Sequence, residues 1–509
     1  MANPLKKLAG ETAIYGLSTI LARILNFFFV PLYTRLLTTE HYGTVTEFMS
    51  YIAILQVVLS LGLETGCFRF ANTHKNPSKV FSSALATVGA LSVLLLGICG
   101  LLGSEIAQGL GYEGYGNVVC YVGLILAIDN ITAILFARLR FAHKALRFAV
   151  FKTLKIGAEL LGNLGLFFLL PSYFQAHPES WLLHFLSPTP DFGYVIVAIM
   201  LSCVLSLLLF LPELLARGAF SIDKALWKQM MRYALPLMLA GLPGILNDLS
   251  DRILFRFFSP EGSVWRAELG VFQAGVKLAV LMSLFIQMFR FAAEPFFFAQ
   301  ARQKEGPALY AQVMGYLSAF CALIFLGVML YMDVIGLLIG PNFREGIAVV
   351  PIMLLAYLLL GLNFQVSMWY KLADKTTAAI YVTCIGLGVT LLVNIFFMPR
   401  FGYMAAAWAH LLSYASILLL NIFLGRRYYP VPYPWGRVLV YVLGAVGVWG
   451  LSALLPEMVL GWKLLVHTLF MGAYSLLLFW HCRRVWRARN RGAHSEPATG
   501  GSCLLRDSA

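Results

Sequence analysis

The stretch VGALSVLLLGICGLLG at residues 88–103 decides the fold class, because it is long, apolar and free of charge. The stretch GYVIVAIMLSCVLSLLLFL at residues 193–211 repeats this pattern. A helix of roughly 20 apolar residues crosses the hydrocarbon core of a bilayer, which is about 30 Å thick. Strands of an outer-membrane barrel would alternate between polar and apolar residues, and these runs do not. The sequence therefore predicts α-helical membrane spans.

The composition supports the same fold class. The chain has 509 residues, of which 60% are hydrophobic and only 12% are charged, too few charges to cover the surface of a soluble domain. The net charge of +14 comes from lysines and arginines in short connections between apolar blocks, so we predict no nucleic-acid partner. The 8 cysteines are scattered without metal-ligand spacing, and we predict neither a disulfide frame nor a metal site.

Hydropathy predicts an all-α polytopic membrane protein with about fourteen transmembrane helices. The expected spans cover residues 11–37, 42–68, 79–103, 117–139, 146–171, 193–215, 232–258, 268–295, 307–332, 346–370, 376–398, 402–425, 436–456 and 461–482. Most of the 38 lysines and arginines lie in connections on the side of the N-terminus. The positive-inside rule therefore places both termini in the cytoplasm.

A weak internal sequence repeat predicts how the spans are organised. The segment FFFVPLYTRLLTTEHYGTVTEF (27–48) and the segment DRILFRFFSPEGSVWRAELGVFQAG (251–275) share an aromatic helix end with arginine, a polar loop, and a glycine that opens the next helix. Such a repeat suggests two parallel six-helix lobes. The predicted parts are an N-terminal lobe (1–216), a C-terminal lobe (217–428), a terminal helix pair (429–482) and a basic, disordered cytoplasmic tail (483–509).

Ionisable residues at membrane depth mark the candidate site, since each costs several kcal/mol unless it faces a protein or water-filled interior. The predicted cations for an anionic head group are Arg23, Lys152, Lys155, Arg252 and Lys277. The predicted acids for a coupling ion are Glu47, Asp129, Asp248 and Asp251. An excess of cations suits a pyrophosphate group.

Local ion pairs are the alternative to a binding site. Helical spacing allows Asp248–Arg252, Lys155–Glu159 and Arg290–Glu294 to pair within their own helices. Those pairs would hold the structure together without binding a ligand.

Three segments resemble one family of membrane proteins: ARILNFFFVPLYTRLLTTEHYGTVTEF (22–48), ALPLMLAGLPGILNDLSDRILFRFF (234–258) and VNIFFMPRFGYMAAAWAHLLSY (393–414). With them the chain resembles the polysaccharide transporter branch, of the O-antigen flippase type, of the multidrug/oligosaccharidyl-lipid/polysaccharide exporter superfamily. In related flippases the cavity between the lobes is cationic. Arg23 and Lys277 fall where such cations are expected.

The resemblance implies a bacterial inner-membrane flippase that works by alternating access. Its implied cargo is an oligosaccharide on undecaprenyl pyrophosphate, moved to the periplasmic leaflet for O-antigen lipopolysaccharide, capsule or exopolysaccharide synthesis. The implied partners are this lipid-linked oligosaccharide, membrane lipids, and a glycan polymerase and glycosyltransferases of the same pathway. No cofactor is expected, and a proton or sodium gradient is the expected driving force.

Other functions stay open at this point. A lipid II flippase or a cation-coupled multidrug exporter would use the same fold. A membrane-embedded glycan polymerase or ligase is a different class, but the sequence has no paired carboxylates on a shared loop and no Walker loop. We therefore expect a transporter without catalytic residues and not an enzyme.

Overall fold

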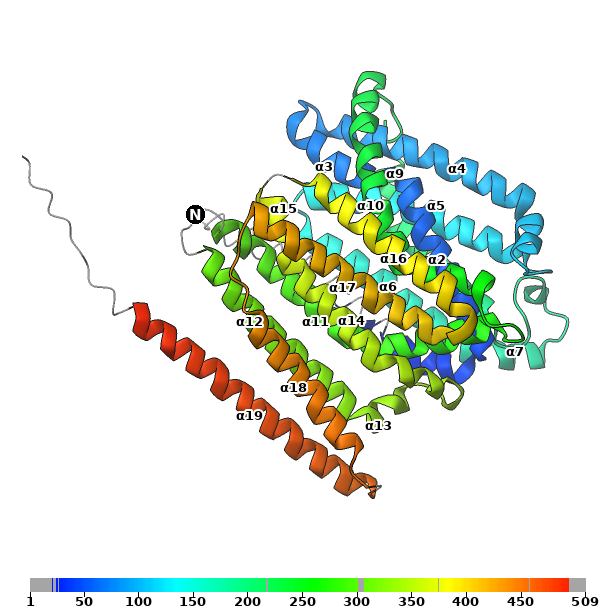
Figure 1. Ribbon diagram of the computed structural model, residues 1–509. Coiled ribbons are helices and arrows are strands. Elements are labelled where there is room, and N and C mark those ends of the chain that lie inside the picture. The colour runs from blue at the N-terminus through cyan, green and yellow to red at the C-terminus, as the bar shows by residue number, and fades with distance from the viewer. Residues whose placement is uncertain are drawn as a thin grey trace, which may run out of the picture. The chain divides into compact units, whose positions relative to one another are not determined.

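The computed structural model is all-helical over the part of the chain that it describes, residues 21, 24–25, 27–216, 218–300, 306–373, 375–456 and 458–493. Figure 1 labels the elements. The α-helices are α2 (Thr39–Ser60), α3 (Leu63–Thr73), α4 (Pro77–Gly109), α5 (Gly116–Phe141), α6 (Ala145–Phe168), α7 (Leu170–Ala176), α8 (Phe192–Leu209), α9 (Leu211–Leu214), α10 (Lys224–Phe258), α11 (Trp265–Gln300), α12 (Gly306–Leu330), α13 (Met332–Ile335), α14 (Val350–Val366), α15 (Met368–Leu372), α16 (Thr377–Phe401), α17 (Tyr403–Tyr428), α18 (Trp435–Ala453) and α19 (Leu460–Ala493). Short 3₁₀ helices are η1 (Trp181–His184), η2 (Gly336–Leu338) and η3 (Pro341–Val349).

Twelve of the described segments are long and apolar enough to cross a membrane, which confirms the prediction of a polytopic membrane protein. They coincide with twelve of the fourteen predicted spans. The other two are the span predicted at residues 11–37, described only in part as a short apolar helix at Phe27–Leu36, and α10. Helix α10 has 35 residues and is long enough to span, but its many charged residues lower its hydropathy.

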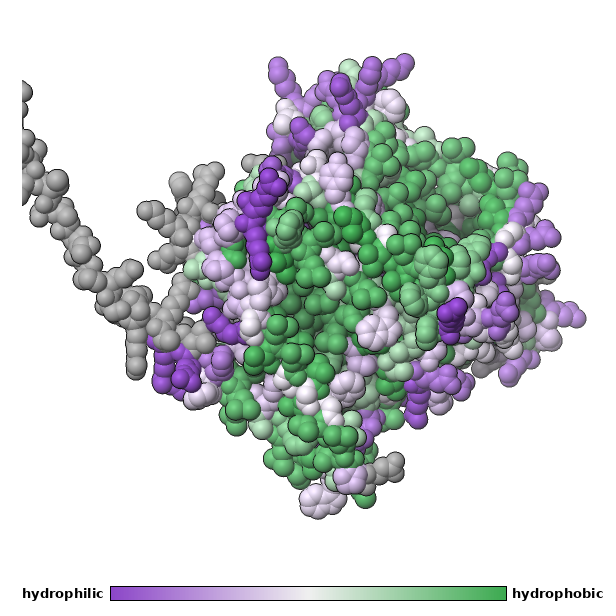
Figure 2. Space-filling view, viewed as in Figure 1, coloured by the Kyte–Doolittle hydropathy of each residue, from purple (hydrophilic) through white to green (hydrophobic). Residues whose placement is uncertain are grey.

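Exposed apolar side chains cover the helices where lipid would contact them. On α4, Val93 is 72% exposed and Leu101 is 86% exposed. Figure 2 shows hydrophobic residues over the middle of the visible face and hydrophilic residues along its margins. A monomeric soluble protein rarely exposes so large an apolar surface.

The second predicted span is broken into α2 and α3. Leu61 and Gly62 both adopt left-handed backbone conformations, with φ of 51° and 67°. A Cβ at Gly62 would lie 2.6 Å from the carbonyl oxygen of Ala234 in α10, so glycine allows the two helices to approach. Broken helices of this kind are common where membrane transporters bind or bend.

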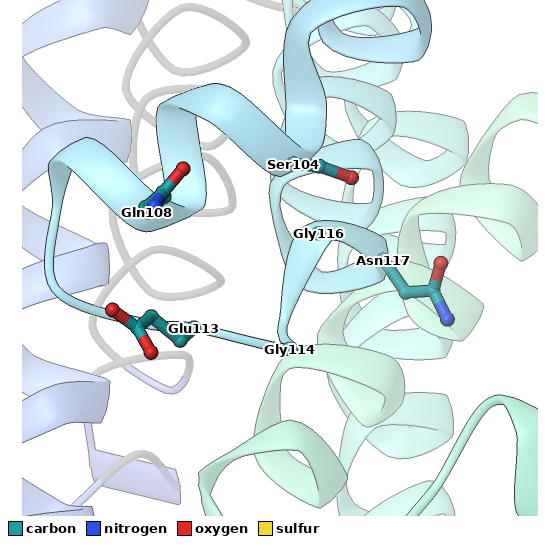
Figure 3. A pocket seen from close by; sticks show the side chains of 6 residues that line it. All are labelled: Ser104, Gln108, Glu113, Gly114, Gly116 and Asn117. Carbon is teal, nitrogen blue, oxygen red and sulfur yellow. The ribbon is translucent and has the colours of Figure 1, made fainter.

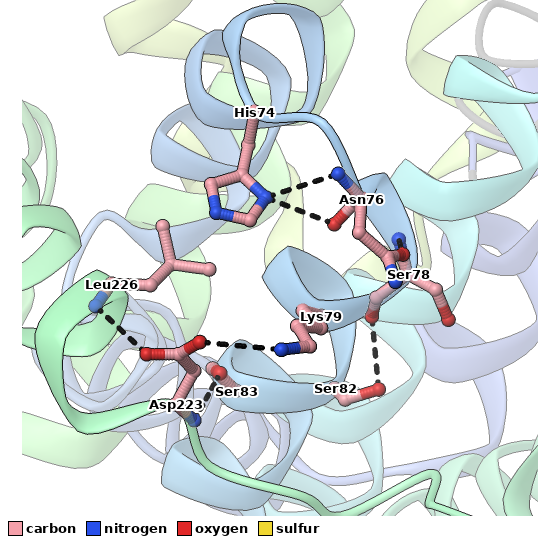
Figure 4. Close-up of polar contacts among 8 residues, drawn as sticks. All are labelled: His74, Asn76, Ser78, Lys79, Ser82, Ser83, Asp223 and Leu226. Carbon is pink, nitrogen blue, oxygen red and sulfur yellow. Dashed lines mark hydrogen bonds and ion pairs between the residues drawn. The ribbon is translucent and has the colours of Figure 1, made fainter.

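The start of α10 is tied to the start of α4 (Figure 4). Asp223 caps α10, because its Oδ1 accepts the N–H of Leu226 at 3.3 Å. Its backbone N–H donates to Ser83 Oγ at 3.1 Å, and its Oδ2 lies 3.6 Å from Lys79 Nζ. These contacts fix where α10 enters the bundle.

The backbones of helices α2 and α11 cross in close contact at Gly43 and Gly270, the two glycines of the internal sequence repeat. A Cβ at Gly43 would lie 1.9 Å from the carbonyl oxygen of Arg266, and a Cβ at Gly270 would lie 2.1 Å from that of Thr39. Each hypothetical Cβ also lies 3.1 Å from the backbone nitrogen of the other glycine. The contact is reciprocal, as a two-fold relation between equivalent segments requires.

The chain folds into two compact units. The larger comprises the described residues up to 300 together with those of 334–430, and the smaller comprises 306–333 and the described residues of 431–493. Within the smaller unit α12 packs against α18 and α19. Helix α12 therefore groups with the terminal helices instead of with the remainder of residues 217–428, and the two six-helix lobes stay a prediction.

The tail predicted to be disordered from residue 483 begins as helix, because α19 continues to Ala493. Alanine and arginine are frequent in this segment and are good helix formers. Residues 494–509 lie outside the described residues.

Candidate functional site

A cavity of about 280 Å³ lies inside the larger unit. It is lined by the Phe27–Leu36 helix and by α2, α6, α8, α10 and α11. Its lining residues are Phe29, Val30, Tyr33, Tyr42, Val45, Thr46, Met49, Glu159, Val195, Ile199, Arg252, Gln273 and Lys277. The cavity thus combines apolar walls with a few polar groups, as small-molecule sites do.

Two predicted cations line this cavity. Arg252 comes from α10 and Lys277 from α11. Arg252 Nη1 lies 3.4 Å from Ser50 Oγ, and its Nε has no hydrogen-bond partner among the described residues. Neither cation forms an ion pair with a described residue. Both side chains therefore have donors available for an anion.

The one acid among the lining residues is Glu159 of α6. It forms no ion pair with Lys155, the partner that helical spacing allows, because Lys155 pairs elsewhere. Beside it, Tyr33 donates to Asn163 Oδ1 at 2.9 Å, which holds the tyrosine ring against α6. Two cations and one carboxylate leave the cavity with a positive excess.

Two other predicted cations are not placed in the cavity. Arg23 lies outside the described residues. Lys152 is on α6, with Nζ 4.5 Å from the ring centroid of Phe136, a cation–π contact.

Lys155 and Asp129 form a largely buried ion pair between α6 and α5. Nζ and Oδ1 are 2.5 Å apart, and the two side chains are 18% and 19% exposed. Cys203 Sγ of α8 also donates to this carboxylate at 3.3 Å. Asp129 thus joins α5 to α6 and α8.

Glu47 is held by tyrosine hydroxyls near the predicted outer side of the membrane. Tyr51 donates to it at 2.6 Å, and Tyr112 donates to its other oxygen. Burial, followed by the charge of Glu47, raises the pKa of Tyr112, so this hydroxyl stays protonated and remains a donor. Arg266 Nε donates to the same Tyr112 oxygen at 3.2 Å.

Asp248 and Asp251 lie in a second polar region, between α10 and α17. Tyr414 donates to Asp248 Oδ1 at 2.8 Å. Among the described residues, Asp248 and Arg252 do not form the predicted local ion pair. His410 Nε2 lies 3.3 Å from Asp251 Oδ2. The third predicted local pair does form: Arg290 Nε and Glu294 Oε2 are 3.9 Å apart.

A second hollow, of about 380 Å³, lies at the loop from α4 to α5. It is lined by Ser104, Gln108, Glu113, Gly114, Gly116 and Asn117. Figure 3 shows its polar side chains spread along the loop and not converging on one point. None of the predicted site residues belongs to it, so the cavity with Arg252 and Lys277 is the stronger candidate.

Sequence reasoning missed the aromatic and histidine partners of the site. Tyr33 and Tyr42 line the cavity, and Tyr414 and His410 contact the two aspartates. The spacing of His410 and Tyr414 puts them on one face of a helix. That spacing could not identify α10 as the helix they face.

Comparisons with known proteins identify the family of the chain and proteins of similar fold. A family model described as "Polysaccharide biosynthesis protein" matches residues 8–301. The fold is similar to a solved "Lipid II flippase MurJ, inward closed conformation", with a TM-score of 0.70 and 12% identity over 92% of this chain and 98% of that chain. No curated protein matches the chain by sequence.

Two MATE transporters also have a similar fold. One is a multidrug resistance MATE family transporter of the MOP superfamily in an outward-facing conformation, with a TM-score of 0.55 and 13% identity over 84% of this chain and 96% of that chain. The other is a MATE transporter of Vibrio cholerae, with a TM-score of 0.54 and 12% identity over 84% of this chain and 98% of that chain. At these identities the similarity concerns the fold alone.

Proposed function

Since the chain belongs to the polysaccharide biosynthesis protein family, we propose that it is a flippase for an undecaprenyl-pyrophosphate-linked oligosaccharide. It moves this cargo from the cytoplasmic to the periplasmic leaflet of a bacterial inner membrane, with both of its own termini in the cytoplasm. It does so by alternating access and without a catalytic step. The glycan belongs to O-antigen lipopolysaccharide, capsule or exopolysaccharide synthesis.

One observation carries this proposal: Arg252 and Lys277 line the same cavity without an acidic partner among the described residues. A buried cation is costly unless a counter-charge accompanies it. An anionic head group supplies that counter-charge, and arginine and lysine bind phosphate oxygens by charge and by hydrogen bonds. Three further cations stay candidates for binding the same head group on its path through the protein: Arg23, Lys152 and Lys155.

The size of the cavity limits what enters it. A volume of about 280 Å³ accommodates a pyrophosphate group but not a chain of several sugars. The glycan therefore extends from the cavity into water, while the polyprenyl chain stays in lipid. This division explains why the cavity needs cations more than it needs sugar-binding groups.

The membrane potential favours the proposed direction of transport. Moving one elementary charge across 100 mV is worth about 2.3 kcal/mol. Because the cell interior is negative, the electrostatic free energy of an anionic head group falls when it moves outward. Coupling to a proton or sodium gradient through Glu47, Asp129, Asp248 or Asp251 would add to this term.

Export of surface glycan in a deletion strain tests the proposal. We expect Arg252→Gln and Lys277→Gln each to reduce surface glycan at least tenfold, with the lipid-linked precursor accumulating in the inner leaflet. Arg252→Lys should retain part of the activity, because it keeps the charge. Lys463→Gln is the matched control, since Lys463 pairs with Asp333 at a partly exposed site in the smaller unit. Normal glycan export by both cavity variants at wild-type protein levels would refute the proposal.

Lipid II is the second candidate cargo, because it carries the same pyrophosphate and the fold is similar to that of a lipid II flippase. Growth of cells depleted of their own lipid II flippase separates the two cargoes. Under our proposal this chain does not restore their growth. A drug exporter would instead raise resistance to cationic drugs.

A further inference from the structure

One end of the smaller unit is strongly basic. Helix α18 has Arg437 in its first turn, and α19 has Arg483, Arg484 and Arg487 toward its end, all with exposed side chains. The start of α18 and this part of α19 lie together, because Arg437 and Cys482 line one hollow. The sequence contains two further arginines before α19 ends. We call the four exposed arginines the basic end of the smaller unit.

No described acid neutralises this basic end. None of its four arginines forms an ion pair with a described residue. Among the described residues of the smaller unit the one acid is Asp333, which pairs with Lys463. Lys463 and Arg483 are 20 residues apart in α19, which corresponds to roughly 30 Å along a helix. The basic end therefore lacks a counter-charge from the part of the unit that the structure describes.

Helix α19 is too long to lie wholly within the hydrocarbon core of a bilayer. Its 34 residues correspond to a length of about 51 Å, whereas the core is about 30 Å thick. The stretch that is long and apolar enough to cross the membrane runs from Leu460 to Arg484. Arg484 and Arg487 are therefore expected at the level of the lipid head groups.

Apolar side chains are exposed on α19 just before the arginines begin. Leu476, Leu477 and Phe479 are 71%, 66% and 64% exposed, so they face lipid chains. Trp480 is also exposed, and the Cζ atom of Arg484 lies 5.4 Å from the centroid of its ring. Tryptophan is typical of the boundary between lipid chains and head groups. Helix α19 thus passes from a surface for acyl chains to a surface for anionic groups within two turns.

A small hollow of about 20 Å³ adjoins the basic end. It lies between α12, α18 and α19, and its lining residues are Gln312, Gly315, Tyr316, Arg437, Tyr441 and Cys482. A hollow of this volume holds one polar group of about the size of a water molecule. It is too small for a head group but large enough for one phosphate oxygen.

We propose that the basic end of the smaller unit binds an anionic phospholipid. The lipid phosphate lies at the mouth of the hollow, between Arg437 and the arginines of α19, and an acyl chain lies along Leu476 and Leu477. The lipid supplies the counter-charge that the described part of the unit lacks. In the orientation given under the proposed function this lipid belongs to the cytoplasmic leaflet, but its binding does not depend on the cargo.

A phospholipid fits this surface better than a soluble anion does, because exposed apolar side chains and arginines adjoin on one helix. Basic residues that directly follow a membrane span attract anionic lipids, and each contributes about a fivefold gain in affinity. Arginine also donates hydrogen bonds to phosphate oxygens in pairs, which lysine does not.

Lipid binding measured by native mass spectrometry of the full chain in detergent tests the proposal. The probes are dioleoylphosphatidylglycerol, which is anionic, and dioleoylphosphatidylcholine, which has the same acyl chains and no net charge. We expect the wild type to bind the anionic lipid at least tenfold more tightly. In the variant with glutamine at Arg437, Arg483, Arg484 and Arg487 this preference should fall below twofold.

Two variants serve as controls. The variant with lysine at the same four positions should keep most of the preference, because it keeps the charge. Lys463→Gln removes a cation from the other end of α19 and should leave the preference unchanged. Thermal unfolding shows whether each variant is folded. If the glutamine variant is not, Arg437→Gln alone decides, with an expected loss in affinity for the anionic lipid of about fivefold.

Three outcomes would overturn the proposal. The first is equal binding of the two lipids by the wild type. The second is an unchanged preference in the folded glutamine variant, which would place the anionic lipid elsewhere on the protein. The third is displacement of the anionic lipid by an equal concentration of farnesyl pyrophosphate, which would assign the four arginines to a pyrophosphate cargo. None of these outcomes bears on Arg252 and Lys277, so the proposed function is tested separately.

Discussion

At the scale of single residues, the pair of Lys155 and Asp129 shows how a buried charge is made tolerable. Both side chains are more than four-fifths buried, and Nζ lies 2.5 Å from Oδ1. Removing one partner of such a pair leaves the other charge buried alone. Measured costs of that kind are about 3 kcal/mol.

We therefore expect Lys155→Met or Asp129→Asn alone to destabilise the protein by about 3 kcal/mol. The double variant should recover most of this loss, because no unpaired charge remains. Unfolding in mixed micelles measures the free energy of unfolding of the wild type, of the two single variants and of the double variant. The Lys463–Asp333 pair, with side chains 37% and 41% exposed, is the control, and its loss should cost at most about 1 kcal/mol.

Additive effects of Lys155→Met and Asp129→Asn would contradict this interpretation. A loss of glycan export by a double variant of normal stability would point instead to a role for the pair in transport. That role stays a prediction.

Residue spacing in the sequence was informative about faces but not about partners. It placed Lys155 and Glu159 on one face of a helix, and the structure confirms that Lys155 belongs to α6. The acid opposite Lys155 is Asp129 of α5, because those two helix faces meet. For the same reason, the position of His410 in the sequence does not identify Asp251 of α10 as its contact.

At the scale of helices, the crossing of α2 and α11 depends on two glycines. A methyl group at Gly43 would lie 1.9 Å from the carbonyl oxygen of Arg266. We expect Gly43→Ala to push the helices apart and to destabilise the protein by about 1–3 kcal/mol, as overpacking does. Unfolding in mixed micelles measures the loss, and Gly97→Ala on α4 is the control, since a Cβ there meets nothing within 4 Å.

An introduced cysteine reports whether the crossing of α2 and α11 opens. In Thr39→Cys, thiol reagents should react faster when Gly43→Ala is also present. An unchanged reaction rate together with unchanged stability would mean that the close approach of α2 and α11 does not matter.

The cap of α10 makes stability depend on pH. The N–H of Leu226, and the nearby charge of Lys79, hold the pKa of Asp223 below its ordinary value of 3.8. A carboxyl whose pKa is lowered in the folded state stabilises it above the ordinary pKa, and this contribution is lost as pH falls through the lowered pKa. Asp223→Ala should thus lower the unfolding temperature at pH 7 and have a smaller effect at pH 3.

Asp223→Asn is the informative companion variant, because asparagine also caps helices. It should keep most of the stability at pH 7 but lose the dependence on pH that is due to this residue. An equal effect of Asp223→Ala at pH 7 and pH 3 would show that the carboxylate charge contributes nothing.

Most helices could be predicted from hydropathy, because length and apolarity are the conditions for crossing a bilayer. The break between α2 and α3 could not. Leu61 adopts a positive φ, which the residue itself disfavours. This positive φ lies beside Gly62, which packs against the backbone of Ala234. Ala234 is 172 residues further along the chain than Gly62.

At the scale of the whole molecule, the grouping of helices differs from their order in the sequence. Helix α12 packs with α18 and α19, although more than a hundred residues separate α12 from α18. Hydropathy identifies each of these helices but contains no information on which apolar faces meet. The two cations of the cavity could be predicted, because Arg252 and Lys277 are charged residues within predicted membrane spans.

Translocation by the purified protein in liposomes tests the central claim most directly. The liposomes contain an undecaprenyl-pyrophosphate-linked oligosaccharide, and a lectin on one side reports the glycan that arrives there. We predict that the wild type and Lys463→Gln expose glycan to the lectin over time, and that folded Arg252→Gln/Lys277→Gln does not exceed protein-free liposomes. Translocation by that double variant at the wild-type rate, or none by the wild type, would contradict the account.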